Sequence, residues 1–141
     1  MRTLVCLMIL TGGLTAQEGR TCTDRTIKGS YGFTFMGARP ASPAPGALIV
    51  EGRGVGIRIF DGQGNFTEVS SVKSVNTPAL VDNRFSGTYK INPDCMGTAF
   101  LLVPGMPAAE FRFVVVKKGK EIFFTLIDPI GPMTLTHLVR Q

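Results

Sequence analysis

Glycine and proline recur at short intervals from residue 29 to the end of the chain, and this spacing limits the possible folds more than any other feature. The 141 residues include 17 Gly and 9 Pro. The runs between them are short and rich in Val, Ile, Phe, Thr and Tyr, which is typical of strands. Eight such runs are predicted as strands: Gly29 to Gly37, Leu48 to Phe60, Asn65 to Val75, Arg84 to Ile91, Thr98 to Val103, Glu110 to Val116, Glu121 to Ile127 and Met133 to Arg140.

The links between these runs are too short for the crossovers of a dozen or more residues that parallel strands need, which favours an antiparallel meander. Several runs, among them "FRFVVV" and "EIFFTLI", have apolar residues at both odd and even positions, which is called parity here and corresponds to the two faces of a strand. A sheet with only one buried face would show a clearer alternation of apolar and polar residues. We therefore predict an all-β fold, an eight-stranded antiparallel up-and-down β-barrel, because closure removes exposed edges. A β-sandwich is the alternative. The only helical turn expected lies between Cys22 and Lys28, with Thr21 or Thr23 as its cap.

The first 16 residues have the pattern of a secretory signal peptide. Arg2 precedes the uncharged segment from Thr3 to Ala16, which is shorter than the ~20 residues of a membrane-spanning helix. The predicted organisation is a signal peptide at 1–16 and one β-barrel domain at 17–141. The mature protein is then secreted or periplasmic, without a membrane anchor.

Cysteine usage agrees with export. Cys6 lies in the signal segment, so Cys22 and Cys95 allow only one pairing in the mature domain. Both lie in polar, turn-like sequence, and we predict a disulfide, which oxidising compartments preserve. The alternative is a pair of free buried thiols. The chain lacks the paired Cys or His spacing of a zinc site.

The stretch "FDGQGNFT" raises the choice between a calcium loop and a hairpin turn. Counted from Asp61, an EF-hand-like loop needs Gly at its sixth position and Glu at its twelfth, where this chain has Phe66 and Val72. Two glycines with Asp and Asn between β-rich runs are typical of a hairpin loop. We predict no metal ion and no cofactor.

Arg58, in "VGIRIF", is the candidate ligand-binding residue. If Phe60 faces inward, Arg58 shares its parity and needs a partner from another strand, for which Glu68, Glu110 and Tyr89 are candidates. Arg58 and Tyr89 would then line the barrel mouth and hold an anionic or carbonyl group of a ligand.

The favoured interpretation of this strand is the opposite one. Val55, Ile57 and Ile59 would face the core and Arg58 would be exposed, since an unpaired buried arginine is rare.

Parity also predicts the core. Phe85, Tyr89 and Ile91 share one face of their strand, and the other face is polar. The predicted core cluster consists of Phe85, Phe100, Phe113 and Phe124.

Motifs for catalysis are not found. The sequence lacks Gly-x-Ser-x-Gly, a P-loop and HExxH. His137, the single histidine, is interpreted as a polar strand residue rather than a catalytic base. The basic cluster from Lys117 to Lys120 has no interleaved aromatic residue and is interpreted as a hairpin tip, so no nucleic-acid partner is predicted. No catalytic residue is assigned, and a binding role is favoured over an enzymatic one.

Several segments resemble a group of small exported bacterial β-proteins. They are "CTDRTIKGSYGF", "FDGQGNFT", "FSGTYKINPDCMGT", "KKGKEIFF" and the terminal "LVRQ". The resemblance covers most of the mature chain and implies a cysteine pair at the same places, but no activity. The strand pattern is also broadly similar to calycin and allene-oxide-cyclase-like eight-stranded barrels. A chain with no Trp cannot contain the lipocalin Gly-x-Trp.

Three functional hypotheses follow. The leading one is a module that binds a small apolar molecule inside the barrel. The second, which the cyclase likeness implies, is a cyclase or isomerase that acts through shape and a few polar groups. The third is a structural or surface-interaction protein with a filled barrel. The sequence leaves the oligomeric state open.

Overall fold

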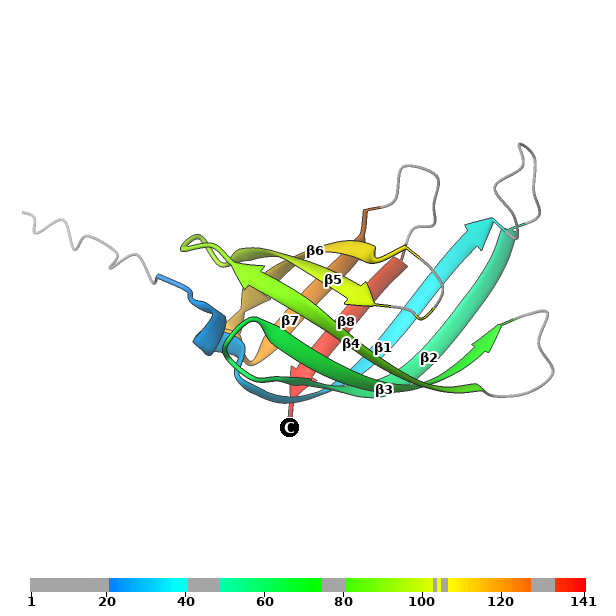
Figure 1. Ribbon diagram of the computed structural model, residues 1–141, viewed down its shortest axis with the longest axis horizontal. Coiled ribbons are helices and arrows are strands. Elements are labelled where there is room, and N and C mark those ends of the chain that lie inside the picture. The colour runs from blue at the N-terminus through cyan, green and yellow to red at the C-terminus, as the bar shows by residue number, and fades with distance from the viewer. Residues whose placement is uncertain (1–20, 41–48, 75–80, 103, 105–106, 128–133) are drawn as a thin grey trace, which may run out of the picture.

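The chain forms a closed eight-stranded barrel in a computed structural model that describes residues 21–40, 49–74, 81–102, 104, 107–127 and 134–141. Each strand pairs antiparallel with the next, and β8 closes the barrel against β1 (Figure 1). The predicted barrel is thus confirmed over the sandwich, while the proposed signal peptide at 1–16 lies outside the described residues. The strands are β1 (Gly29–Pro40), β2 (Ile49–Phe60), β3 (Asn65–Ser74), β4 (Val81–Ile91), β5 (Met96–Leu102), β6 (Ala109–Val116), β7 (Glu121–Leu126) and β8 (Thr134–Arg140).

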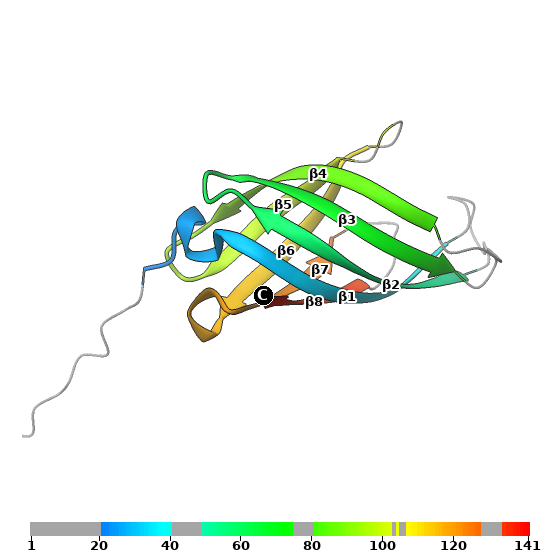
Figure 2. The same ribbon diagram turned by 90° about the horizontal axis from the view of Figure 1, so that it is seen from below.

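One end of the barrel is closed by η1 (Asp24–Ile27), a short 3-10 helix at the predicted helical turn. Both views show η1 at the same end as the turn η2 (Lys117–Gly119) and the tight β2–β3 and β4–β5 turns (Figures 1 and 2). Ile27 is fully buried in the core cluster, so η1 acts as a plug. Within the described ranges, no helix has the length and apolar character needed to span a membrane.

A disulfide and hydrogen bonds hold this plug on the barrel. Cys22 and Cys95 form the predicted bond, with their Cα atoms 5.0 Å apart. The Asp24 carboxylate accepts a hydrogen bond of 2.8 Å from the backbone N–H of Ile91. The start of the domain is therefore tied to the turn that joins β4 and β5.

The predicted inward and outward faces of β4 are confirmed. Tyr89 and Ile91 are buried, whereas Thr88 and Lys90 are exposed. Phe85 points to the same side as Tyr89 but is only half-buried.

The prediction for β5 is wrong. Phe100 is 40% exposed on the outer face, and its neighbour Ala99 is the fully buried residue. Ala99 lies between Tyr89 of β4 and Phe111 of β6, so a small methyl side chain is what fits between these two rings on β5.

Aromatic rings fill the closed half of the barrel. Phe113 and Phe124 stack with ring centroids 4.7 Å apart, and Phe60 lies 6.5 Å from Phe124. Tyr31 and Tyr89 meet Phe60 edge-on at 5.5 and 5.1 Å. These contacts form a packed aromatic layer in the same core cluster as Ile27 of the plug.

Candidate functional site

The β2–β3 hairpin places the two charged residues of the candidate site. The loop that joins the strands is the predicted hairpin turn: the Asp61 carboxylate accepts hydrogen bonds from the backbone N–H groups of Gln63 and Asn65, at 2.6 and 3.0 Å. Hydrogen bonds from Asn65, foremost that of its side chain, lower the pKa of Asp61. In the resulting register Arg58 pairs with Glu68 across the two strands. Among the described residues, no group of three potential metal ligands comes together.

Arg58 and Glu68 form an ion pair inside the barrel, with only 4% and 6% of each residue exposed. Glu68 Oε2 accepts hydrogen bonds from Nε of Arg58, at 2.8 Å, and from Nη2. The favoured interpretation, that Arg58 is exposed and Val55, Ile57 and Ile59 face the core, is therefore wrong. The alternative with Glu68 as partner is the correct one.

Three phenylalanine rings surround the Arg58 guanidinium. Its central carbon lies 4.8 Å from the ring centroid of Phe66, 4.7 Å from Phe124 and 5.4 Å from Phe33. Contacts of this kind attract a desolvated cation. Together with the ion pair they offset the cost of removing Arg58 from water and hold its side chain in one place.

A pocket of about 160 Å³ lies inside the barrel on the side of this ion pair away from η1. Its walls are apolar, and its polar surface comes from the ion pair and three hydroxyl-bearing residues. The apolar residues are Phe33, Phe35, Val72, Phe85, Leu101 and Phe111. The polar ones are Arg58, Glu68, Ser70, Thr134 and Thr136.

The hydroxyl residues of this pocket are poorly exposed. Ser70 and Thr136 are buried. The Oγ1 atom of Thr134 is buried without a hydrogen-bond partner. Buried polar atoms usually have a hydrogen-bond partner. The Thr134 Oγ1 atom has none, so it is available for a hydrogen bond with a ligand in the pocket. Sequence reasoning missed Ser70, Thr134 and Thr136, although each occupies an inward position on its strand.

Tyr89 lies in the closed half rather than on this pocket. Its hydroxyl accepts a hydrogen bond from Gly62 N at 3.1 Å and donates one to the Asp24 carbonyl at 2.9 Å. Burial raises the pKa of Tyr89 to about 12. Phe60 and Phe66 pack between Tyr89 and Arg58, since Phe60 contacts both Tyr89 and Phe66. The structure thus places Tyr89 within the aromatic layer and Arg58 on the pocket side of it, so the two candidate ligand-binding residues do not line one site.

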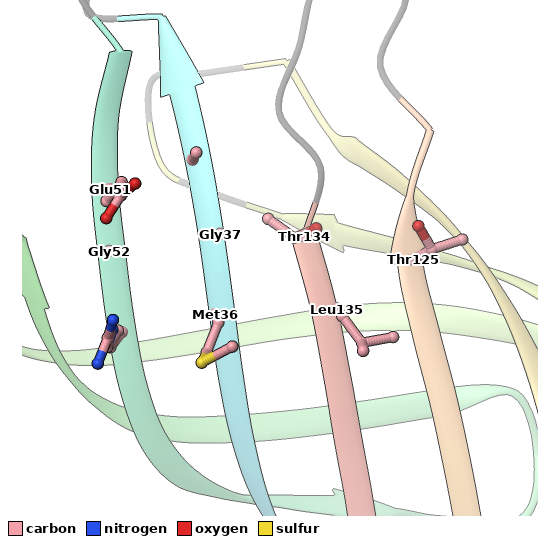
Figure 3. Close-up of a pocket in the computed structure, with 9 residues that line it drawn as sticks. Met36, Gly37, Glu51, Gly52, Thr125, Thr134 and Leu135 are labelled. Atoms are coloured by element: carbon pink, nitrogen blue, oxygen red, sulfur yellow. The ribbon is translucent and has the colours of Figure 1, made fainter.

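A second hollow, of about 520 Å³, lies on the outer surface over β1, β2, β7 and β8 (Figure 3). Met36 and Leu135 are its main apolar residues, and Glu51 and Thr125 stand at its sides (Figure 3). Met36 and Leu135 are 60% and 59% exposed. This hollow would leave a small molecule largely in water, so the interior pocket is the better candidate.

His137 lies on the outer face of β8. Its ring stacks on Phe123 with centroids 4.5 Å apart, and its Nε2 lies 3.6 Å from an oxygen of Glu121. Lys117 binds the same carboxylate and lowers the pKa of Glu121. These contacts are those of a packed surface residue.

Comparisons with known proteins leave the function open. No protein-family profile matches the chain, and no curated protein matches it. Among solved structures, an S-type phycobiliprotein lyase from Guillardia theta is similar at 10% sequence identity and a TM-score of 0.48, covering 84% of this chain and 90% of the lyase chain. A likeness this distant carries no argument about function.

Proposed function

We propose that the protein binds one small, largely apolar molecule in the open half of its barrel. The observation that carries this proposal is the pocket of about 160 Å³, which has phenylalanine walls and a buried Arg58–Glu68 pair beside it. Apolar walls with a few convergent polar groups are the usual composition of a ligand site.

The pocket volume limits the ligand. An engineered apolar protein cavity of about 150 Å³ binds benzene, whereas sites for drug-sized molecules run to about 300–1,000 Å³. A ligand of one substituted ring or a short branched chain suits this barrel. The filled-barrel hypothesis accounts for the closed half but leaves the pocket unexplained, and no observation specifically favours a cyclase or isomerase.

Binding of ethylbenzene, measured by isothermal titration calorimetry, tests the proposal. We expect a dissociation constant on the order of 1 mM or tighter, which corresponds to about 4 kcal/mol, because small ligands gain roughly 0.3–1.5 kcal/mol for each heavy atom and ethylbenzene has eight. Leu101 lines the pocket, so Leu101→Trp should fill it and abolish binding.

Leu102 on the same strand is 49% exposed on the outer face, and Leu102→Trp is the matched control that should bind normally. No binding by the unmodified protein, or equal binding by both variants, would contradict the proposal. Native mass spectrometry of protein purified from its own host can then identify a retained ligand.

We further propose that residues 1–16 are removed during export and that residues 17–141 form the mature domain. The uncharged segment before Gln17 and the Cys22–Cys95 disulfide support this, since disulfides persist mainly in oxidising compartments. The intact mass of the exported protein should correspond to a chain that begins near Gln17, and retention of Met1 would contradict the proposal.

A further inference from the structure

We infer that the ligand of the barrel pocket is uncharged and carries a hydrogen-bond acceptor at its polar end, such as the carbonyl oxygen of a ketone, aldehyde, ester or lactone. This inference rests on the proposed function and names the ligand class for the same pocket. It follows from the charge balance of the pocket, from the hydrogen-bond donors left on Arg58, and from the immobility of the Arg58 side chain.

The charges that line the pocket already cancel. Among the described residues that line it, Arg58 and Glu68 are the only charged ones, and they form an ion pair. A carboxylate ligand beside Arg58 would therefore bring a second negative charge next to Glu68. Like charges close together in a poorly solvated site repel strongly, so an anionic ligand is disfavoured.

A cationic ligand is disfavoured for the corresponding reason. An ammonium group could approach the Glu68 carboxylate only with Arg58 already beside it. The ion pair thus selects against both signs of charge, and a neutral ligand avoids either repulsion.

Arg58 nevertheless keeps donors to offer. A guanidinium has five N–H bonds and no acceptor, and Glu68 accepts from Nε and from Nη2. The remaining N–H groups on Nη1 and Nη2 can serve an acceptor on the ligand. The buried hydroxyls of Ser70 and Thr136 line the same pocket and can donate to a neutral oxygen as well.

The Arg58 side chain is fixed before any ligand arrives. The rings of Phe33, Phe66 and Phe124 lie around the guanidinium, and Glu68 holds two of its nitrogens. Donors that are held in place lose little entropy when an acceptor binds. The pocket is thus pre-organised to bind a carbonyl oxygen at a fixed Arg58 side chain, and binding does not require that side chain to move.

Acetophenone and benzoate test this inference, because a methyl ketone and a carboxylate on the same ring have nearly the same shape and differ in charge. Calorimetry at neutral pH on the unmodified protein should show acetophenone binding at least about tenfold more tightly than benzoate, a ratio that corresponds to about 1.4 kcal/mol. Equal or tighter binding of benzoate overturns the inference.

Glu68→Gln provides the second readout. The amide oxygen still accepts from Arg58, but the cation is no longer neutralised, so benzoate affinity should rise by at least about tenfold while acetophenone affinity changes by less than about threefold. An unchanged benzoate affinity in a folded Glu68→Gln protein overturns the inference. If this variant does not fold, the ratio of the two affinities in the unmodified protein decides alone.

Ethylbenzene separates this inference from the proposed function. If ethylbenzene binds and benzoate binds as well as acetophenone, the pocket is real and only the ligand class is wrong. If ethylbenzene does not bind, the proposed function itself fails.

Discussion

At the scale of single residues, glycines decide which face of β2 looks inward. Gly54 and Gly56 lie opposite Phe35 and Phe33 of β1. A Cβ atom on Gly54 would lie 2.2 Å from Cε1 of Phe35. The rings of β1 therefore occupy the space above the β2 backbone, and glycine is the residue that leaves room for them. The same arrangement recurs at Gly87 with Phe66 and at Gly97 with Phe113.

This arrangement predicts that Gly56→Ala destabilises the barrel. The new methyl group would lie 2.4 Å from the Val69 carbonyl oxygen and 2.7 Å from Cζ of Phe33, and the carbonyl belongs to a paired strand that cannot shift freely. We expect the free energy of unfolding to fall by about 1–3 kcal/mol in urea melts.

Gly52→Ala on the same strand is the matched control. The atom nearest to the new Cβ would be the Lys73 carbonyl oxygen, at 3.9 Å, which is an ordinary van der Waals contact. Its stability should stay the same or rise by up to about 1 kcal/mol, since alanine restricts the unfolded chain. Equal losses in the two variants would mean that ring-over-glycine packing does not set the orientation of β2.

The same glycines explain which residues sequence reasoning placed wrongly. Parity worked on β4 because Ser86, Thr88 and Lys90 mark its outer face with polar groups. It failed on β2 because a row of glycines carries no hydrophobic signal, so the apolar Val55 and Ile57 looked like the inner face. The ring that fills an inward glycine position comes from a neighbouring strand, and the sequence of one strand does not contain it.

The raised pKa values of the two tyrosines of the chain predict how the free energy of unfolding depends on pH. Burial raises the pKa of Tyr31 and raises that of Tyr89 to about 12, against an ordinary value of about 10. The folded state therefore favours the protonated phenol, so this contribution to stability is fully present below about pH 10 and is lost as the pH rises toward about 12.

Ultraviolet titration of the phenolate should show little ionisation in the folded protein near pH 10. Urea melts should show the free energy of unfolding falling between about pH 10 and about pH 12. In Tyr89→Phe the fall should be shallower, because one of the two raised groups is gone. Ionisation of both tyrosines near pH 10 without unfolding would contradict the buried positions of their hydroxyls.

At the scale of elements, the short segment before β1 is what closes one end of the barrel. Turn residues and strand composition were enough to predict the eight strands and the helical turn, because both are local signals. They were not enough to predict that Ile27 fills the barrel end, which depends on contacts between η1 and distant strands. The cysteine pair was a long-range contact that sequence alone could supply residue by residue, since only one pairing was available.

The plug predicts the effect of removing the disulfide. The bond joins residues 73 positions apart. In the chain-entropy model its loss lowers stability by about 4 kcal/mol, and measured losses in small domains run from about 2 to 5 kcal/mol. Replacing both cysteines with serine should lower the melting temperature while the circular dichroism of the barrel persists.

Amide hydrogen exchange shows where in the molecule the stability is lost when the disulfide is removed. The Ile91 amide, which donates to the Asp24 carboxylate, should exchange faster in the double serine variant, because η1 is then held only by non-covalent contacts. Protection of the Val69 amide, in the β2–β3 ladder, should change much less. An unchanged melting temperature would show that the disulfide does not stabilise the plug.

At the scale of the whole molecule, the barrel consists of a packed half and a hollow half. Phe60, Phe113 and Phe124 are buried in the core cluster that includes Ile27 of the plug, whereas Phe85 is half-buried and lines the pocket. The Arg58–Glu68 pair lies at the boundary between the two halves. The sequence could not reveal this boundary, because phenylalanine occurs in both halves and hollowness is a property of how eight strands meet.

The division into two halves predicts that equal truncations have unequal costs. Phe124→Ala removes a fully buried ring that packs on Phe113 and on the Arg58 guanidinium, so it should lower the free energy of unfolding by about 3–5 kcal/mol. Phe85→Ala removes a ring that already borders open space, so the loss should be nearer 1 kcal/mol. Urea melts measure both.

The same variant tests the pocket. Phe85→Ala should enlarge the pocket and tighten the binding of a ligand bulkier than ethylbenzene, such as naphthalene. Phe100 is exposed, and Phe100→Ala is the control that should alter neither stability nor binding appreciably. Phe85→Ala could instead lower the free energy of unfolding as much as Phe124→Ala and bind naphthalene no better than the unmodified protein. In that case the hollow half is packed like the packed half, and the barrel has no room for the ligand that we propose.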